Sequence, residues 1–237
     1  MKFIKRYIPH SFKIQLYLLK RKLLDTLQNK KYASVIHIKD IGHIQTELTL
    51  KIMPSTFFEN KVHNLRIVQQ KLEGITIYPG EYFSFWKSTG KASKKNGFKE
   101  GRNLVAGKVS QDTGGGICQF SSLLYYAALK TGFIITERHH HSIDIYKEDE
   151  RYIPLGADST VVYGFRDLQF INPYSFPVQL KSKIEDNSIT LHILAENKFP
   201  EHHVDFEYSH QPDTVSVKTV INQKVVAENI YNKILTR

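Results

Sequence analysis

The spacing of apolar side chains along the chain predicts three helices. The first lies within residues 1–31. The second begins after a suitable N-cap, Asn60, and ends at Gly74, and the third spans Ile117–Thr131. In the first helix the apolar positions recur at steps of three and four residues: Phe12, Leu16, Leu19, Leu23 and Leu27. Each helix therefore has an apolar face that has to be covered.

Between the helices, short runs of β-branched and aromatic residues predict strands. They cover residues 35–38, 46–52, 75–78, 82–86, 133–137, 139–146, 160–165, 178–184, 188–195, 215–221 and 225–227. Two pairs are predicted to form hairpins, one around Pro79-Gly80 and one around Glu185-Asp-Asn187, with a loop over 87–99. We therefore expect an α+β protein in which a mainly antiparallel sheet packs against the third helix.

Composition and pattern divide the chain into three segments. Residues 1–31 form a basic amphipathic helix, 32–200 the main domain, and 201–237 a β-rich extension that can belong to the same domain. The length of 237 residues is sufficient for a buried core, and 41% hydrophobic against 24% charged residues excludes a disordered or fibrous chain.

Positive charge is concentrated in the first segment. Residues 1–31 hold nine basic side chains and one acid, so they account for most of the net charge of +10. The rest is nearly balanced, and we expect no binding to nucleic acid. The amphipathic helix fits either an anionic membrane surface or a site on the protein's own body.

The first helix is too polar to cross a bilayer. Its longest uncharged stretch, 14–19, is shorter than a transmembrane span or the core of a signal peptide. We therefore expect no ordinary export signal and a cytoplasmic location, either free or peripheral at the inner face of the membrane.

Cys118 is the single cysteine of the chain, so no disulfide can form within it. It follows Gly114-Gly-Gly116 at the start of the third predicted helix. The helix dipole there favours a thiolate over a thiol and makes the sulfur more nucleophilic. The alternative is a structural role as a small buried apolar residue.

Three histidines, His139-His-His141, begin a predicted strand after this helix. Alternation places His139 and His141 on the face shared with the isoleucines of the strand, which points inward. One of these imidazoles is then placed to accept the Cys118 proton, with Asp158 orienting the ring. Papain-like and transglutaminase-like enzymes use the same order of cysteine, histidine and acid, which is an analogy only.

The same atoms could instead bind zinc. Cys118, His139 and His141 offer three ligands, with Asp158 or water as the fourth. Neither a CxxC nor an HExxH spacing is present, so this alternative ranks below nucleophilic catalysis, and we expect no cofactor.

Five motifs resemble those of a known family, the VanW family, over roughly residues 55–180. They are Asn60-Lys-Val-His-Asn-Leu-Arg66, Tyr78-Pro-Gly-Glu-Tyr-Phe-Ser-Phe-Trp86, Gly114-Gly-Gly-Ile-Cys-Gln119, Glu137-Arg-His-His-His-Ser142 and Gly156-Ala-Asp-Ser-Thr160. By position, the resemblance assigns the family's pattern to Gly115, Gly116, Cys118, Gln119, His139, His141 and Asp158.

The resemblance implies a link to cell-wall metabolism or to glycopeptide antibiotic resistance. We therefore expect a cysteine-dependent peptidase, amidase or transpeptidase that acts on a peptide or a cell-wall precursor. Gln119, Gly115, Gly116 and Ser121 are expected to bind substrate or to stabilise an oxyanion. The competing hypothesis is a non-enzymatic module that binds such a peptide in the same groove.

Overall fold

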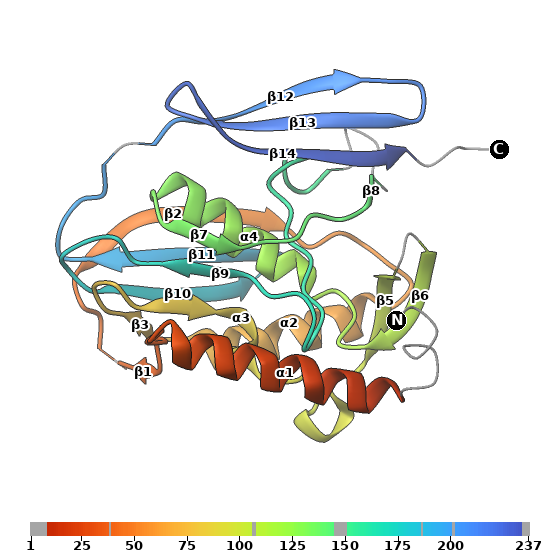
Figure 1. The fold of residues 1–237 in the computed structure, drawn as a ribbon, viewed down its shortest axis with the longest axis horizontal. Helices are drawn as coiled ribbons and strands as arrows, with labels where there is room; N and C mark the ends of the chain where they lie inside the picture. Colours follow the sequence, from red (N-terminus) through yellow and green to blue (C-terminus); the bar gives the residue numbers. More distant parts are fainter. Residues whose placement is uncertain are drawn as a thin grey trace.

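A computed structural model describes residues 9–37, 39–105, 108–144, 151–185, 187–200 and 202–233. Its architecture is α+β, and the strands of these residues form four sheets (Figure 1). All strand pairs are antiparallel except β8 with β14. The expected α+β class with mainly antiparallel pairing is therefore confirmed.

Two sheets hold most of the strands. The larger has the order β1 (Val35–Ile36), β3 (Ile75–Ile77), β10 (Val178–Glu185), β11 (Ser188–Ala195) and β2 (His43–Lys51). The second has the order β12 (Val204–His210), β13 (Thr214–Ile221), β14 (Lys224–Lys233) and β8 (Ile143–Asp144).

The two remaining sheets are small, and the helices lie around and between all four. The small sheets are β4 (Tyr82–Ser84), β9 (Gln169–Ile171) and β7 (Ile134–Glu137), and the hairpin of β5 (Glu100–Val105) with β6 (Lys108–Thr113). The helices are α1 (His10–Leu27), α2 (Phe58–Leu72), α3 (Phe85–Thr89), α4 (Cys118–Lys130) and a 3-10 turn over Lys94–Asn96.

The hairpin predicted around Pro79-Gly80 is wrong. β3 pairs with β1 and β10, whereas β4 pairs with β9, so the turn carries the chain from one sheet to another. The chain then enters α3, because the Ser84 side chain accepts a hydrogen bond from the Lys87 backbone N–H and caps the helix. The other predicted hairpin is confirmed as β10 with β11.

The strands predicted over 139–146 and 160–165 are also largely absent. In the first, the described strand is β8 alone, and residues 145 and 146 lie outside the described residues. In the second, an isolated bridge joins Val162 to Arg166. Backbone groups there bond to side chains or to distant loops: the His141 N–H donates to the Asp158 carboxylate, and the Thr160 N–H donates to the His139 carbonyl.

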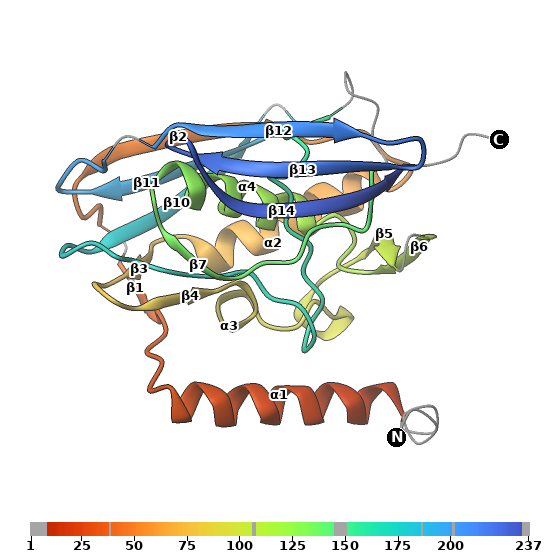
Figure 2. The same ribbon diagram turned by 45° about the horizontal axis from the view of Figure 1, so that its top comes forward.

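α4 lies in the interior, between the five-stranded sheet and the β12–β14 sheet (Figures 1 and 2). Ten of its thirteen residues are buried. The Tyr126 ring of α4 packs near the Phe206 ring of β12 in the C-terminal sheet (β12, β13, β14 and β8), with ring centroids 6.1 Å apart. Because such a helix is packed on several sides, its first residue, Cys118, is held in a fixed place.

α1 lies on the outside, on the side opposite to the β12–β14 sheet (Figure 2). The Arg21 guanidinium donates two hydrogen bonds of 2.6 Å to the Glu137 carboxylate, and Asp25 pairs with Lys87 at 3.1 Å. None of the helices in the described residues is long and apolar enough to span a membrane.

The backbone of the loop before α4 is in direct contact with the backbone of β5. A Cβ atom on Gly115 would overlap the backbone of Gly101, so the two glycines allow the loop and the strand to touch. The Gly115 carbonyl also accepts a hydrogen bond of 3.0 Å from the buried Asn64 amide. This contact fixes the loop that precedes Cys118.

We expect Gly115→Ala to lower the free energy of unfolding by more than the Gly80→Ala control. A methyl group at position 115 has no room, and overpacking of this kind costs about 1–3 kcal/mol or more. Gly80 has φ +73° but no atom near its Cβ position, so its substitution carries only the backbone cost, about 1 kcal/mol. Urea denaturation measures both, and equal losses would contradict the close approach.

Candidate functional site

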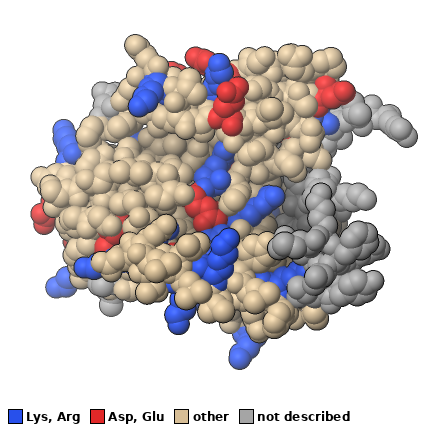
Figure 3. Space-filling view, viewed as in Figure 1, with Lys and Arg blue, Asp and Glu red and all other residues tan. Residues whose placement is uncertain are grey.

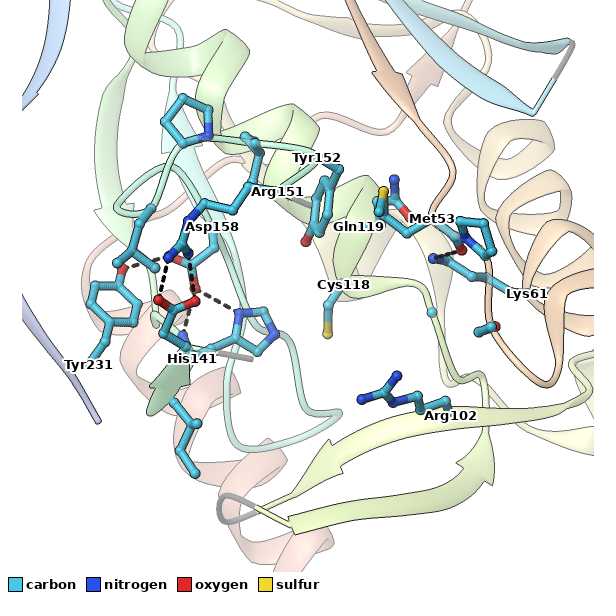
Figure 4. A pocket seen from close by; sticks show the side chains of 18 residues that line it. Met53, Lys61, Arg102, Cys118, Gln119, His141, Arg151, Tyr152, Asp158 and Tyr231 are labelled. Carbon is cyan, nitrogen blue, oxygen red and sulfur yellow. Dashed lines mark hydrogen bonds and ion pairs between the residues drawn. The ribbon is translucent and has the colours of Figure 1, made fainter. Parts of the chain in front are cut away.

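A pocket opens at the start of α4 (Figure 4). Cys118 and Gln119 of α4 line it together with His141 and Asp158, and Lys61 of α2 lies on the opposite side. The pocket therefore gathers residues from four distant parts of the sequence, among them three that the sequence predicted to act together.

Cys118 is partly buried at the N-terminus of α4. Gly114 and Gly116 in the preceding turn have φ values of +86° and +92°, a conformation that glycine adopts without strain. The sulfur lies 3.7 Å from the Thr160 hydroxyl and 4.0 Å from the Val161 carbonyl oxygen. Since no side chain caps α4, the positive end of the helix dipole faces the sulfur.

His141 lies beside Cys118 and is held by Asp158 (Figure 4). The Asp158 Oδ2 atom is 2.7 Å from both the ring Nδ1 and the backbone N of His141. Burial lowers the pKa of His141, but the hydrogen bonds and charges of Asp158 and Cys118 outweigh burial and raise it. The imidazole is thus stabilised in its protonated form.

The pKa of the Cys118 thiol moves the other way. Burial raises it, but the hydrogen bond and the positive charge of His141 outweigh burial, and the net pKa lies below that of an ordinary thiol. Together with the raised pKa of His141, this direction favours a thiolate and imidazolium ion pair.

Asp158 is a buried carboxylate with four hydrogen-bond donors. Its Oδ2 atom serves His141, while Oδ1 accepts from the Tyr231 hydroxyl at 2.6 Å and the Arg138 guanidinium at 3.0 Å. Burial raises its pKa, but the hydrogen bonds and charges of His141 and Arg138 hold the pKa well below its usual range. The acid is therefore ionised at neutral pH.

Arg138 and Tyr231 were missed by the sequence analysis. Arg138 directly precedes the histidine run and also donates to the carbonyl oxygens of Gly156 and Asp158 and to the Asn229 side chain. An arginine within a run of titratable residues is a usable signal. Tyr231 lies in β14, and nothing in the sequence points from there to residue 158.

Ser121 does not line the pocket. It is fully buried, and its hydroxyl donates to the Ser159 carbonyl at 2.6 Å, while the Ser159 N–H donates to the Ser122 hydroxyl at 2.9 Å. These bonds attach the chain around Asp158 to the first turn of α4. Ser121 thereby sets the place of the acid relative to Cys118.

The two candidate histidines separate. The His139 ring lies 3.0 Å from the Glu137 carboxylate and does not line the pocket, so His141 is the histidine that accompanies Cys118. Gln119 lines the pocket, but its amide N–H₂ donates to the Lys51 carbonyl. Gly115 packs on Gly101, as described above.

A metal centre does not form from these residues. Within the described part of the chain, no three side chains of His, Cys, Asp or Glu are arranged to hold a metal ion. His139, one of the three expected ligands, is paired with Glu137 instead.

Comparison with known proteins places the chain among relatives of one kind. The family model described as "VanW like protein" matches residues 60–194. The vancomycin B-type resistance protein VanW of Enterococcus faecalis is 34% identical over 140 residues, which are 59% of this chain and 51% of that protein. The uncharacterized protein YoaR of Bacillus subtilis is 31% identical over 147 residues, 60% of this chain and 46% of that protein.

The matched region therefore spans about half the length of these relatives. The part matched by the family model, residues 60–194, contains Cys118, His141 and Asp158, whereas Tyr231 lies beyond its end. No solved structure matches the chain.

Iodoacetamide should alkylate Cys118 with a pH midpoint below 8.5, the usual thiol value. Because the His141 charge stabilises the thiolate, His141→Ala should move the midpoint upward. His139→Ala is the matched control and should leave it unchanged. Cys118 is the single thiol, so mass spectrometry of the intact protein reports the rate. A wild-type midpoint near 8.5 that His141→Ala does not move would contradict the pairing.

Tyr231→Phe should lower the free energy of unfolding by about 1–3 kcal/mol, because it removes a buried donor to a charged acceptor. Tyr208→Phe, on β12 of the same sheet, is the control, because Tyr208 is 42% exposed and its 3.3 Å bond goes to a neutral acceptor, the Leu155 carbonyl. We expect it to cost less. Urea denaturation monitored by circular dichroism measures both, and a Tyr231→Phe effect no larger than the control would count against the Asp158 contact.

Proposed function

The chain belongs to the VanW family, and we propose that it is a cysteine-dependent acyl-transfer enzyme, of the peptidase, amidase or transpeptidase kind. The proposal rests on this family membership and on the residues that line the pocket. Its substrate is a peptide or peptide-bearing precursor of the cell wall. The cell-wall assignment rests on the family and on the relative whose name records vancomycin resistance.

The observation that carries the proposal is the arrangement of Cys118, His141 and Asp158 around one pocket. The 2.7 Å bond from Asp158 fixes the imidazole, and the imidazole stabilises the thiolate. A partly buried cysteine without a nucleophilic role needs neither an ion-pair partner nor a buried acid behind that partner. The papain-like order of the three residues supports the same reading by analogy.

In the proposed reaction, the Cys118 thiolate attacks the carbonyl carbon of the scissile amide and forms a tetrahedral adduct. Protonated His141 then gives its proton to the leaving nitrogen, the C–N bond breaks, and an amine departs from a thioester. Water or a second amine attacks the thioester while His141 accepts a proton, and the Cys118 thiolate is expelled. Asp158 keeps the ring oriented throughout.

The oxyanion of the adduct is proposed to lie at the N-terminus of α4, where the positive end of the helix dipole stabilises negative charge. Gly115 packs against the Gly101 backbone and Gly116 against the Lys61 stem, so neither glycine is assigned to the oxyanion. The Gln119 amide N–H₂ is committed to Lys51, so it is not assigned to the oxyanion.

The test uses peptidoglycan stem peptides with the full-length protein. We expect intact-mass spectrometry to show an acyl adduct on Cys118, and chromatography to show an amine product. Cys118→Ala and His141→Ala should each lower product formation by at least about a hundredfold, the scale of general acid–base and nucleophilic contributions.

His139→Ala is the matched control and should retain activity. Turnover that survives Cys118→Ala would refute the mechanism. Binding of the stem peptides with no adduct and no product would favour the competing hypothesis of a binding module.

A further inference from the structure

Lys61 is a buried cation on the pocket wall that faces Cys118 (Figure 4). The side chain is 9% exposed, and its stem passes over Gly116, where a Cβ atom would lie only 2.5 Å from the Lys61 Cγ. The glycine of the turn before Cys118 therefore makes room for the lysine. This packing holds the lysine on the wall of the pocket that Cys118 also lines.

The charge of Lys61 is poorly compensated. Its Nζ donates to the Met53 carbonyl at 3.0 Å, and no carboxylate pairs with it within the described residues. Burial and the positive charge of Arg102, which also lines the pocket, lower its pKa to about 8. Two cations held together at the edge of a pocket attract an anion.

Gln119 adds a second unmet requirement. Its side chain is 3% exposed, it lines the pocket, and its Oε1 atom has no hydrogen-bond donor within the described part of the chain. A buried carbonyl oxygen without a partner costs free energy, which a ligand N–H would recover. The wall opposite His141 can therefore bind one anion at Lys61 and Arg102 and one N–H donor at the Gln119 Oε1 atom.

We propose that Lys61 and Arg102 bind a free carboxylate of the substrate while Gln119 accepts its amide N–H. The substrate would then be a peptide whose scissile bond lies near its C-terminal residue, since an amide N–H and a carboxylate occur together there. This inference rests on the proposed function for the reaction, but the binding site is testable without turnover.

The test compares two alkylating reagents that react through the same iodomethylene group but differ in charge. Iodoacetate carries a carboxylate, whereas iodoacetamide is neutral, so the ratio of their rates with Cys118 measures attraction of an anion to the pocket. We expect Lys61→Met to lower this ratio about tenfold, the effect of one charge a few ångströms away, with little change in the iodoacetamide rate. Arg102→Met should lower it in the same direction.

Lys71→Met, on α2 but outside the pocket lining, is the matched control and should leave the ratio unchanged.

A second experiment measures protection of Cys118 against iodoacetamide. N-acetylglycine should protect the cysteine, and N-acetylglycinamide should not. A ratio unmoved by both pocket variants would overturn the carboxylate site even if acyl transfer is found. Protection by inorganic phosphate alone would overturn the carboxylate assignment. A lowered ratio without acyl transfer would leave the site standing and refute only the reaction.

A second inference concerns α1, whose two faces have opposite surroundings. One face contacts the body through Arg21 and Asp25, with Ile14 against Gly164. At about 100° per residue, the face opposite to these residues carries the apolar positions. They are all exposed, by 44–82%: Phe12, Leu16, Leu19, Leu23 and Leu27. The apolar face therefore points away from the protein.

Lysines flank this apolar face. Lys20 lies on one side of it and Lys22 on the other, and both are exposed. In the space-filling view, Lys and Arg side chains are spread over the part of the surface where α1 lies (Figure 3). The acid of the helix, Asp25, is turned inward to Lys87, so it does not offset them.

The geometry points to an anionic membrane surface as the occupant of this face. Leucines would enter the boundary of headgroups and acyl chains, and the flanking lysines would contact lipid phosphates. A second copy of the chain would bury the leucines but bring these lysines together, so charge complementarity favours the lipid.

Vesicle cosedimentation tests this inference. The protein should bind vesicles of phosphatidylcholine with phosphatidylglycerol, bind phosphatidylcholine alone much less, and be released as salt rises. The double variant Leu19→Gln, Leu23→Gln should lose at least about tenfold in binding, since it removes two leucines that would be buried in the lipid. Val226→Gln with Ile230→Gln, equally exposed on β14, is the control and should bind normally.

A dimer in solution that the leucine variant dissociates, without vesicle binding by either protein, would overturn the inference in favour of a second copy. Binding that the leucine variant retains would equally overturn it.

Discussion

The buried carboxylate of Asp158 is the group on which the site depends. An ionised acid in the interior is stable only where charge and hydrogen bonds replace water, and here Arg138, Tyr231 and His141 do so. Arg138 and His141 lie in the loop between β7 and β8, and Tyr231 lies in β14. One carboxylate therefore ties the C-terminal sheet to the pocket and orients the imidazole beside Cys118.

α4 contributes the other half of the geometry. Its first turn carries the sulfur, and hydroxyls of the same turn bond to Ser159, the neighbour of Asp158. The positions of Cys118 and Asp158 are thereby both fixed relative to α4. The Gly101 and Gly115 contact restrains the loop on the other side of the sulfur. Residues outside the pocket lining thus determine the distances within the site.

Much of this could be predicted from local pattern, and the rest could not for physical reasons. Helical periodicity located α2 and α4, and alternation located β10 and β11. The histidine run failed as a strand because its backbone groups bond to Asp158, a tertiary contact that no local pattern encodes. Likewise, no local pattern distinguishes Lys61 from the other lysines, and only the fold brings it over Gly116. Family motifs identified the residues near Cys118, but Tyr231 lies outside them.

The pairing of Asp158 with Arg138 limits how this site can change in evolution. Replacing the acid alone would leave a buried guanidinium without a counter-charge, and replacing the arginine alone would leave a buried carboxylate without one. Either single substitution is therefore strongly destabilising. Selection for stability alone is therefore sufficient to keep both residues. Because stability alone accounts for this pair, its presence in a related sequence indicates an intact fold and carries no information about the use of the pocket.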